Sequence, residues 1–201
     1  MKQTNKELFR QFLHLFFGII FVYFIYSNIL NNTAIFALLI ISIIFSLISK
    51  KIRIPVLSWF LEKFERDNHL RKMPGRGFIF FLAGSLLVLK LFEKDIALAS
   101  IMVLTIGDSI SHIAGIQGFA GKLKNPFSKK KFFDGIIFGT IGGAVGALFF
   151  VNPIEACIGA LIAIIAESIE FALNGEAVDD NLIVPLIAGT TIYLLRLWFG
   201  I

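Results

Sequence analysis

The sequence predicts an all-α fold: a polytopic transmembrane bundle of about seven spans with a cytoplasmic interfacial amphipathic helix. Of the 201 residues, 57% are hydrophobic and only 16% are charged, whereas about 25% of the residues of soluble domains carry a charge. The apolar residues fall in stretches near the roughly 20 residues that cross a bilayer as a helix. Lys and Arg residues gather between alternate stretches. No repeat divides the chain, which predicts a single domain over residues 1–201.

Seven apolar stretches define the expected spans. The first follows Lys2, Lys6 and Arg10, as the apolar run of a signal peptide would. It is long, however, and polar residues follow it in place of a small-residue cleavage site, which favours a span. The seven spans are expected at residues 11–27, 33–49, 77–92, 96–115, 134–151, 153–173 and 181–199.

The longest polar interval runs from Ile54 to Arg76. Pro55 stands near its start, and Trp59 and other apolar residues recur among the charges that follow. This pattern is typical of an amphipathic helix in the membrane interface, with Trp at the level of the lipid headgroups. It predicts the interfacial helix on the cytoplasmic side.

The positive charges predict the orientation, because Lys and Arg are enriched in cytoplasmic segments. With the N-terminus inside, sixteen of the nineteen Lys and Arg residues fall in cytoplasmic segments, and only Lys90, Lys94 and Arg196 fall outside. The net charge of +5 then indicates topology and attraction to anionic lipids, and no nucleic acid is expected as a partner. The outer half of the bundle is expected to be almost purely apolar.

Two carboxylates lie well inside the expected spans, Asp108 in the fourth and Glu167 in the sixth. A charged side chain at the centre of a spanning helix costs roughly 2.5 to 3.5 kcal/mol, so each is expected to have a partner or a function. Both spans run from outside to inside. The two carboxylates are therefore expected at similar depth in the cytoplasmic half of the membrane.

Further polar groups are expected beside these carboxylates. Helical spacing puts three residues on the face of Asp108, a pair of polar residues begins the first span, and a polar segment follows the sixth. These groups are Ser111, His112 and Gly115; Arg10 and His14; and Asp179, Asp180 and Asn181. Together they predict one pocket on the cytoplasmic side.

Carboxylates that face one another in a medium of low dielectric repel, and a divalent cation relieves the repulsion. Asp and Glu oxygens suit Mg²⁺, which takes further oxygens from substrate phosphates. The lysines between Lys122 and Lys131 are point charges available to such phosphates. The combination predicts a phosphoryl-transfer site with a metal at Asp108 and Glu167.

Several segments carry a resemblance to a known family. They are Gly107-Asp108-Ser109-Ile110-Ser111-His112-Ile113-Ala114-Gly115, Lys131-Phe132-Phe133-Asp134-Gly135, Ala166-Glu167, and Asp180-Asn181 with Pro185. In this order they resemble the dolichol kinase, phytol kinase and CTP-dependent diacylglycerol kinase family. Arg10 with His14 is similar to that family's N-terminal element, in which Lys usually stands at the position of Gln11. Family members are small membrane enzymes that move the terminal phosphate of CTP to a lipid alcohol.

The resemblance implies a CTP-dependent lipid kinase with Mg²⁺ as cofactor, and with CTP, a membrane lipid alcohol and the bilayer as partners. It implies that Asp108, Glu167 and Asp180 are the catalytic set, and it leaves open which is the base and which holds the metal. Phosphate and nucleotide contacts are implied for Arg10, His14, Gly107, Gly115, Lys131 and Asn181. The lipid hydroxyl is expected to enter sideways from the inner leaflet.

Two other classes of function stay open. A cytidylyltransferase that makes a CDP-lipid needs the same metal, triphosphate and membrane interface, but its His-Gly-Gly run followed by an Asp-Arg pair does not occur in this sequence. A transporter is expected to carry charges along a path that reaches both faces. The sequence also leaves open the identity of the lipid alcohol, the preference for CTP over ATP, and whether the protein is a homo-oligomer.

One glycine-rich stretch in the fifth span is expected to be structural. Its glycines have the small-xxx-small spacing that lets two helices approach closely. They are Gly139, Gly142, Gly143 and Gly146. The spacing predicts tight packing of the fifth span against a neighbouring helix.

Overall fold

The structure is a computed structural model that describes residues 3–49, 73–118, 133–169, 172–173 and 176–200. Within these ranges the chain is helical apart from one short antiparallel strand pair. The elements are α1 (Gln3–Tyr26), α2 (Asn32–Ser49), α5 (Arg76–Leu91), α6 (Lys94–Met102), the π-helix η1 (Val103–Asp108), α7 (Ser109–Gln117), α8 (Phe133–Ala147), α9 (Pro153–Ser168), β1 (Ala172–Leu173), β2 (Glu176–Ala177) and α10 (Asp180–Phe199).

All seven predicted stretches are helical, which confirms the all-α class. In the described ranges four helices are long and apolar enough to cross a membrane: α1, α2, the continuous helix of α6, η1 and α7, and α10. The helices α5, α8 and α9 have 15 or 16 residues, which is about 22 to 24 Å at 1.5 Å per residue. The prediction of seven full spans is therefore not confirmed, since these three are shorter than the roughly 30 Å hydrocarbon core.

Two predicted boundaries also need comment. The sixth stretch was expected to reach residue 173, but α9 ends at Ser168 because Ile169 is extended and β1 follows. The predicted interfacial helix over 54–76 falls almost entirely outside the described residues, and so does Lys131.

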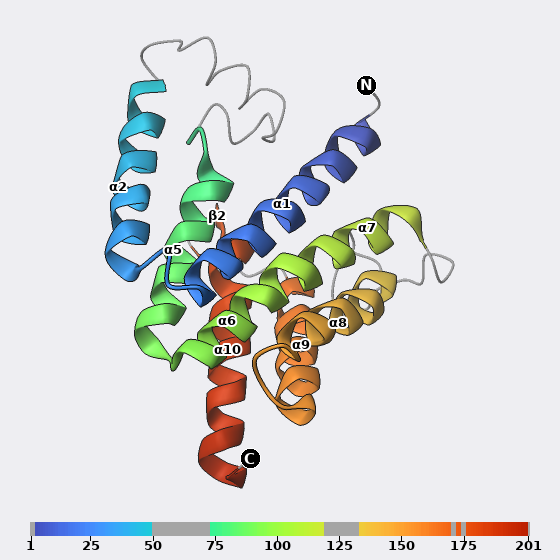
Figure 1. Cartoon of the computed structure of the whole chain (residues 1–201). Coiled ribbons are helices and arrows are strands. Elements are labelled where there is room, and N and C mark those ends of the chain that lie inside the picture. The colour runs from blue at the N-terminus through green and yellow to red at the C-terminus, as the bar shows by residue number, and fades with distance from the viewer. Residues whose placement is uncertain (1–2, 50–72, 119–132, 170–171, 174–175, 201) are drawn as a thin grey trace.

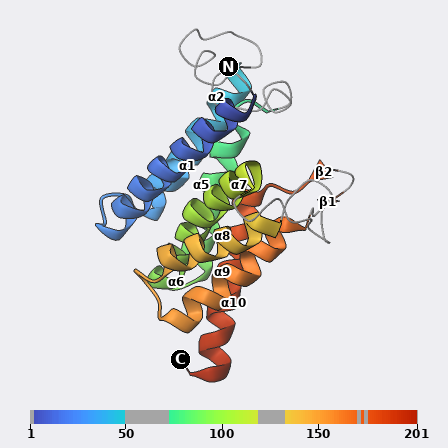
Figure 2. The ribbon, with the colours of Figure 1, turned by 90° about the vertical axis from the view of Figure 1, so that its right-hand side faces the viewer.

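The helix formed by α6, η1 and α7 lies at the centre of the molecule. Nearly every residue of α6 and η1 is buried, as expected for a helix that is apolar on all sides. Figure 2 shows α1 and α2 on one side of it and α8 and α9 on the other. The hydrophobic core runs through this helix and includes Leu82, Ile101, Leu104 and Ala160.

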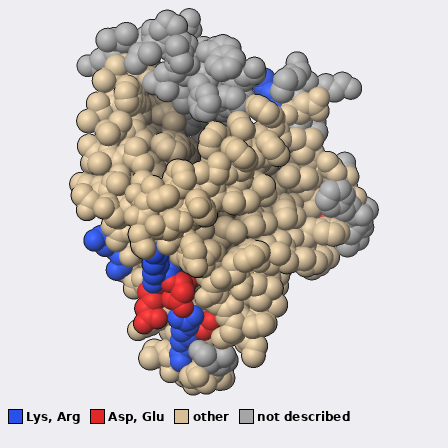
Figure 3. Space-filling view, viewed as in Figure 1, with Lys and Arg blue, Asp and Glu red and all other residues tan. Residues whose placement is uncertain are grey.

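The outer faces of the bundle are apolar. Large hydrophobic residues are exposed along α1, α2 and α10, among them Phe12, Phe45 and Leu197. The space-filling view shows broad surfaces without charge, while acidic and basic residues gather at one end (Figure 3). An exposed apolar surface of this extent marks a membrane-facing region, and the apolar helices indicate a helical membrane protein.

The charged end lies where α6 and α9 begin and α10 ends, opposite to Asp108 and Glu167. Arg196 pairs there with the buried Glu155 at 2.6 Å, with Asp95 at 2.7 Å and with Glu93 at 3.4 Å. The expectation of an almost purely apolar outer half is wrong at this end. Hydropathy averaged over a span does not detect these residues, because they stand in the terminal turns of three different helices.

Candidate active site

Asp108 is the last residue of the π-helix, and α7 begins at the next residue. Short π-helical segments inside α-helices are rare and occur frequently at functional sites. Asp108 is 8% exposed, and Nδ1 of His112, one turn later, lies 3.5 Å from Oδ1 of Asp108. The predicted helical pairing of Asp108 and His112 is confirmed.

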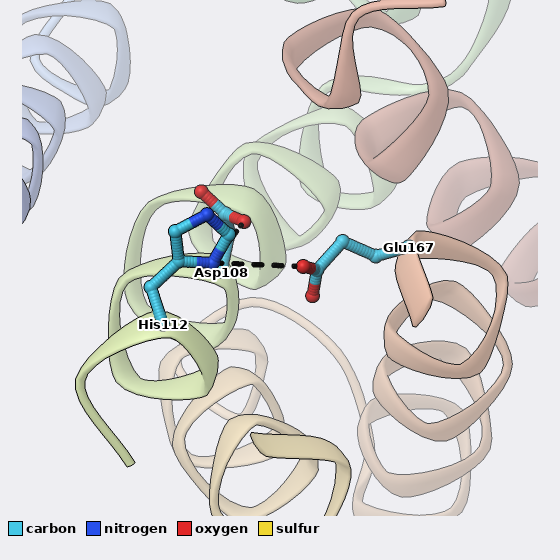
Figure 4. A group of neighbouring side chains, drawn as sticks. All are labelled: Asp108, His112 and Glu167. Atoms are coloured by element: carbon cyan, nitrogen blue, oxygen red, sulfur yellow. Dashed lines mark ion pairs between the residues drawn. The ribbon is translucent and has the colours of Figure 1, made fainter. Parts of the chain in front are cut away.

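Glu167 reaches the same imidazole from α9. Its Oε1 lies 3.7 Å from Nδ1 of His112, and Figure 4 shows both carboxylates directed at the ring. One ligand atom from each of Asp108, His112 and Glu167 falls within a group 4.8 Å across. The two carboxylates therefore meet, as their predicted depth required.

This trio is a candidate metal site. Separations of 3.5 and 3.7 Å are longer than normal hydrogen bonds between N and O. Ligands on one Mg²⁺ at about 2.1 Å are roughly 3 Å apart, so a small inward movement would bring these atoms to a common cation. The prediction counted oxygen ligands only, and the structure adds an imidazole nitrogen, which suits transition metals as well.

Most of the other predicted polar residues line one cavity of about 940 Å³. The polar residues in its wall come from five parts of the described chain. They are Arg10, Gln11 and His14 of α1; Ser42, Ser46 and Ser49 of α2; Arg76 of α5; Asp108 and His112; and Asp179, Asp180 and Asn181 at the start of α10. The predicted convergence of Arg10, His14, Asp108, Asp180 and Asn181 on one pocket agrees with this geometry.

A close approach of α1 to the central helix brings the first of these groups into the cavity. A Cβ on Gly18 would lie 2.4 Å from Cγ2 of Thr105 in η1, so a larger residue at this crossing would force Thr105 to move. Nearer the N-terminus of α1, Arg10 forms an ion pair with Glu7. Glu7 also accepts a hydrogen bond from the side chain of Gln11 at 3.2 Å. His14 packs edge-on against Phe81, with ring centroids 5.4 Å apart.

Arg76 is a site residue that sequence reasoning missed, and its partner is Asp179, which was predicted for the pocket. Nε of Arg76 donates to Oδ2 of Asp179 at 3.0 Å, although 103 positions separate the two residues. Asp179 is the N-cap of α10, and its Oδ1 accepts from the backbone N–H of Asn181 at 3.2 Å and from its side-chain amide at 2.9 Å. The N-terminal turn of α10 is thus fixed at the cavity wall. The only signal in the sequence was an Asp before a helix, typical of an N-cap.

Two predicted phosphate-binding residues lie elsewhere. A Cβ on Gly107 would meet Ile164, the carbonyl of Gly139 and the Cα of Gly143, so Gly107 is positioned for helix packing and is not among the residues that line the cavity. Gly115 also lies outside the cavity lining, and a Cβ there would meet nothing within 4 Å.

The glycines of α8 hold the helix of Asp108 in place, which confirms the packing prediction. A Cβ on Gly139 would lie 2.7 Å from Cβ of Ser111 and 2.9 Å from the carbonyl oxygen of Gly107. A Cβ on Gly142 would lie 2.4 Å from Cδ1 of Ile110, and one on Gly146 would lie 2.9 Å from Cδ1 of Ile106. The glycine-lined face of α8 therefore lets η1 and α7 pack closely against it. Asp108 lies where η1 ends and α7 begins.

The fold and the site together define a helical membrane protein with a buried carboxylate–imidazole–carboxylate trio beside an amphipathic cavity. The chain is 30% identical over 187 residues to the uncharacterized protein MJ1137 of Methanocaldococcus jannaschii, and the match covers 90% of each chain. The chain belongs to the same family as that protein. No family model matches the chain, and no solved structure matches it.

Proposed function

We propose that the protein is a CTP-dependent lipid kinase, which transfers the terminal phosphate of CTP to a membrane lipid alcohol. The observation that best supports this proposal is the cavity of about 940 Å³, whose wall is polar around Asp108 and apolar between α1 and α2. A kinase for a lipid alcohol needs both kinds of wall, since one substrate is a triphosphate and the other is a hydroxyl on a hydrocarbon chain.

The reaction asks the protein mainly to align two oxygens and to neutralise charge. The lipid hydroxyl oxygen forms a bond to the terminal phosphorus of CTP, while the bond from that phosphorus to the bridging oxygen breaks and CDP leaves. The hydroxyl proton passes to a carboxylate, for which Asp108 and Asp180 are the candidates in the cavity wall. Arg10 and Arg76, each held by an acidic partner, are the cations for the phosphate oxygens.

Asp108 and Glu167, with His112 between them, would hold the Mg²⁺ ion. When bound, Mg²⁺ neutralises the negative charge of the phosphates. Two carboxylates directed at one imidazole suit a divalent cation better than a neutral ligand.

The proposal places the site on the cytoplasmic side, where CTP is available, with the N-terminus inside. The preference of Lys and Arg for cytoplasmic segments supports this orientation. Arg10 and Arg76, two of the cytoplasmic cations in that assignment, line the cavity itself.

A transfer assay tests the proposed function. The purified protein in detergent, with Mg²⁺, is given CTP or ATP labelled at the terminal phosphate, together with a panel of polyprenols and glycerol-based lipid alcohols. We expect CTP-dependent label in an organic-extractable product, lost on Asp108→Asn by at least about 100-fold. Asp95→Asn makes the same chemical change at the opposite end of the bundle and is expected to leave transfer intact.

Three outcomes would contradict the proposal. If no lipid is labelled with any donor and acceptor, the kinase assignment is wrong. If the Asp108→Asn protein transfers phosphate fully, Asp108 is not part of the active site. Release of pyrophosphate with formation of a CDP-lipid would identify a cytidylyltransferase in place of a kinase.

A further inference from the structure

We infer that Asp108, His112 and Glu167 bind a divalent transition-metal ion such as Mn²⁺ more tightly than Mg²⁺, with Nδ1 of His112 as a ligand. The inference deepens the proposed function and rests on it for what the ion does in phosphate transfer. The preference itself follows from the residues at the site, and it is tested without nucleotide or lipid.

The imidazole nitrogen and the two carboxylates form one group of potential ligands. Nδ1 of His112 lies 3.5 Å from Oδ1 of Asp108 and 3.7 Å from Oε1 of Glu167. One ligand atom from each of the three residues lies within 4.8 Å of the others, and the same ring nitrogen faces both carboxylates (Figure 4). An ion between the two carboxylate oxygens therefore lies beside this nitrogen.

The three ligands are carried by helices that contact one another near the site. A Cβ on Gly139 of α8 would lie 2.7 Å from Cβ of Ser111 in α7 and 3.2 Å from Cγ2 of Ile164 in α9. Ser111 directly precedes His112, and Ile164 lies about one turn before Glu167. Figure 1 shows α8 packed against both α7 and α9. Helix packing therefore fixes the separation of the ligands, as a preorganised metal site requires.

An ion can reach the trio from the cavity. Asp108 and His112 line the cavity wall, whereas Glu167 is not among the lining residues and is 2% exposed. Glu167 therefore belongs to the buried side of the trio, and an ion would enter past Asp108 and His112. Coordination positions that the protein leaves open would face the cavity, where the proposed nucleotide binds.

One nitrogen ligand among three changes which divalent ion the site prefers. Mg²⁺ takes oxygen ligands and keeps several waters. Carboxylates suit both Mg²⁺ and Mn²⁺, whereas imidazole suits transition metals, and the affinity of such mixed sites rises further from Mn²⁺ toward Cu²⁺. The imidazole of His112 is therefore the group that distinguishes a transition-metal ion from Mg²⁺.

An imidazole that only donates a hydrogen bond to a carboxylate is the competing interpretation. In that case Nδ1 of His112 carries a proton and cannot be a metal ligand. The two interpretations differ in whether a bound ion contacts this nitrogen, which can be measured directly.

Mn²⁺ is the probe because its unpaired electrons detect a coordinated nitrogen. The protein is purified in detergent through a tag without histidine and is studied in a nitrogen-free buffer, without CTP or lipid. Loss of the electron paramagnetic resonance signal of free Mn²⁺ measures binding, and the pulsed form of the experiment detects coupling to an imidazole nitrogen. We expect nitrogen-coupled Mn²⁺ with a Kd at least about tenfold below that of Mg²⁺, measured by competition.

His112→Asn tests the ligand atom. Oδ1 of Asn occupies the same position along the side chain as Nδ1 of His, so the variant replaces the nitrogen by an oxygen. We expect the nitrogen coupling to disappear and the preference for Mn²⁺ over Mg²⁺ to fall by about tenfold. Glu167→Gln removes an oxygen ligand, so it should weaken both ions while the Mn²⁺ that still binds keeps its nitrogen coupling.

Two controls locate the signal. The chain has three histidines, and His14→Gln combined with His69→Gln leaves only His112, so this double variant should keep the nitrogen coupling. If His112→Asn does not fold, the double variant still tests the inference, because loss of the coupling would assign it to another histidine. Glu93→Gln at the opposite end of the molecule should leave Mn²⁺ binding unchanged.

Failure of the inference and failure of the proposed function are distinguishable. If Mn²⁺ does not bind, binds without nitrogen coupling, or binds no better than Mg²⁺, the inference is overturned, and transfer assays with Mg²⁺ decide the kinase separately. If nitrogen-coupled Mn²⁺ binds as expected but no phosphate reaches any lipid, the metal site is supported and the kinase assignment is wrong.

Discussion

A single imidazole nitrogen faces two buried carboxylates at the candidate site. Nδ1 of His112 lies 3.5 Å from Asp108 and 3.7 Å from Glu167, and one proton on this nitrogen can serve only one acceptor at a time. The arrangement therefore places two acidic groups and one basic group within reach of a common ligand. At the scale of single residues, Glu167 is the sharper test, because it is 2% exposed and lies outside the cavity lining.

We expect Glu167→Gln to reduce phosphate transfer by at least about 100-fold, since the amide keeps the shape of the side chain but removes the charge that would hold the proposed metal. The measurement is transfer of labelled phosphate at saturating lipid. Glu93→Gln is the matched control, because its carboxylate is mostly exposed at the opposite end of the molecule. Equal loss in both variants would mean that the effect is not local to the site.

At the scale of secondary-structure elements, the contacts between crossing helices determine where the polar residues lie. Among the described glycines, Gly84 in α5 makes the closest approach to a neighbouring helix, which is α10. A Cβ on Gly84 would lie 2.2 Å from the backbone carbonyl oxygen of Asn181, and backbone atoms cannot rotate away as a side chain can. The first turn of α10, which carries Asp180 and Asn181, is therefore positioned by a glycine in α5.

We expect Gly84→Ala to destabilise the protein by about 1 to 3 kcal/mol through overpacking and to raise KM for the nucleotide, because Asn181 must move. Gly115→Ala is the contrasting variant, since its Cβ meets open space and alanine favours a helix interior by about 0.5 to 1 kcal/mol. Thermal unfolding in detergent measures both. If the Gly84→Ala protein is as stable as the unaltered protein, α5 and α10 do not approach each other as closely as the structure shows.

The opposite end of the bundle depends on an ion pair between elements. Arg196 in the last turn of α10 makes two hydrogen bonds to Glu155, which also closes the capping box of α9 with Asn152. Glu155 is 1% exposed, so its charge needs Arg196. The pair joins α9 to α10 at a distance from the site.

We expect Arg196→Met to destabilise the protein by roughly 3 to 5 kcal/mol, because it leaves a buried carboxylate without its cation. The double variant with Glu155→Met should recover much of this loss, and transfer per folded molecule should be unchanged. Denaturant unfolding followed by circular dichroism measures the stability. Equal stability of Arg196→Met and the unaltered protein would show that the pair contributes nothing.

The whole molecule has polar groups at two ends and apolar surface between them. The start of α1 and the end of α10 lie at opposite ends in both ribbon views (Figures 1 and 2). The trio of Asp108, His112 and Glu167 belongs to one end, and the Arg196 cluster belongs to the other. Such a distribution suits a protein whose middle is surrounded by hydrocarbon.

Cysteine labelling tests the proposed orientation. In a Cys157→Ser background, which removes the single cysteine, Asn5→Cys and Gly200→Cys place one thiol at each end of the described chain. We expect a membrane-impermeant thiol reagent to label Gly200→Cys from outside intact cells, and Asn5→Cys only after permeabilisation. Labelling of both from the same side would contradict the predicted topology.

The sequence by itself predicted the helical class, the seven apolar segments and several residues that meet at the candidate site. Hydropathy and helical spacing are local properties, so Asp108 with His112, Arg10 with His14, and the packing glycines of α8 were all predictable. The depth argument also brought Glu167 to Asp108, because each carboxylate has the same energetic reason to avoid the lipid.

Only the tertiary structure decided which of the remaining charges line the cavity and how its apolar part is formed. The pairing of Arg76 with Asp179 spans 103 positions, and the shortness of α5, α8 and α9 follows from where their ends pack and not from hydropathy. The place of the α2 serines in the cavity wall likewise depends on helix crossings. Crossing geometry is set by side-chain shape at distant contacts, and no local pattern in the sequence encodes it.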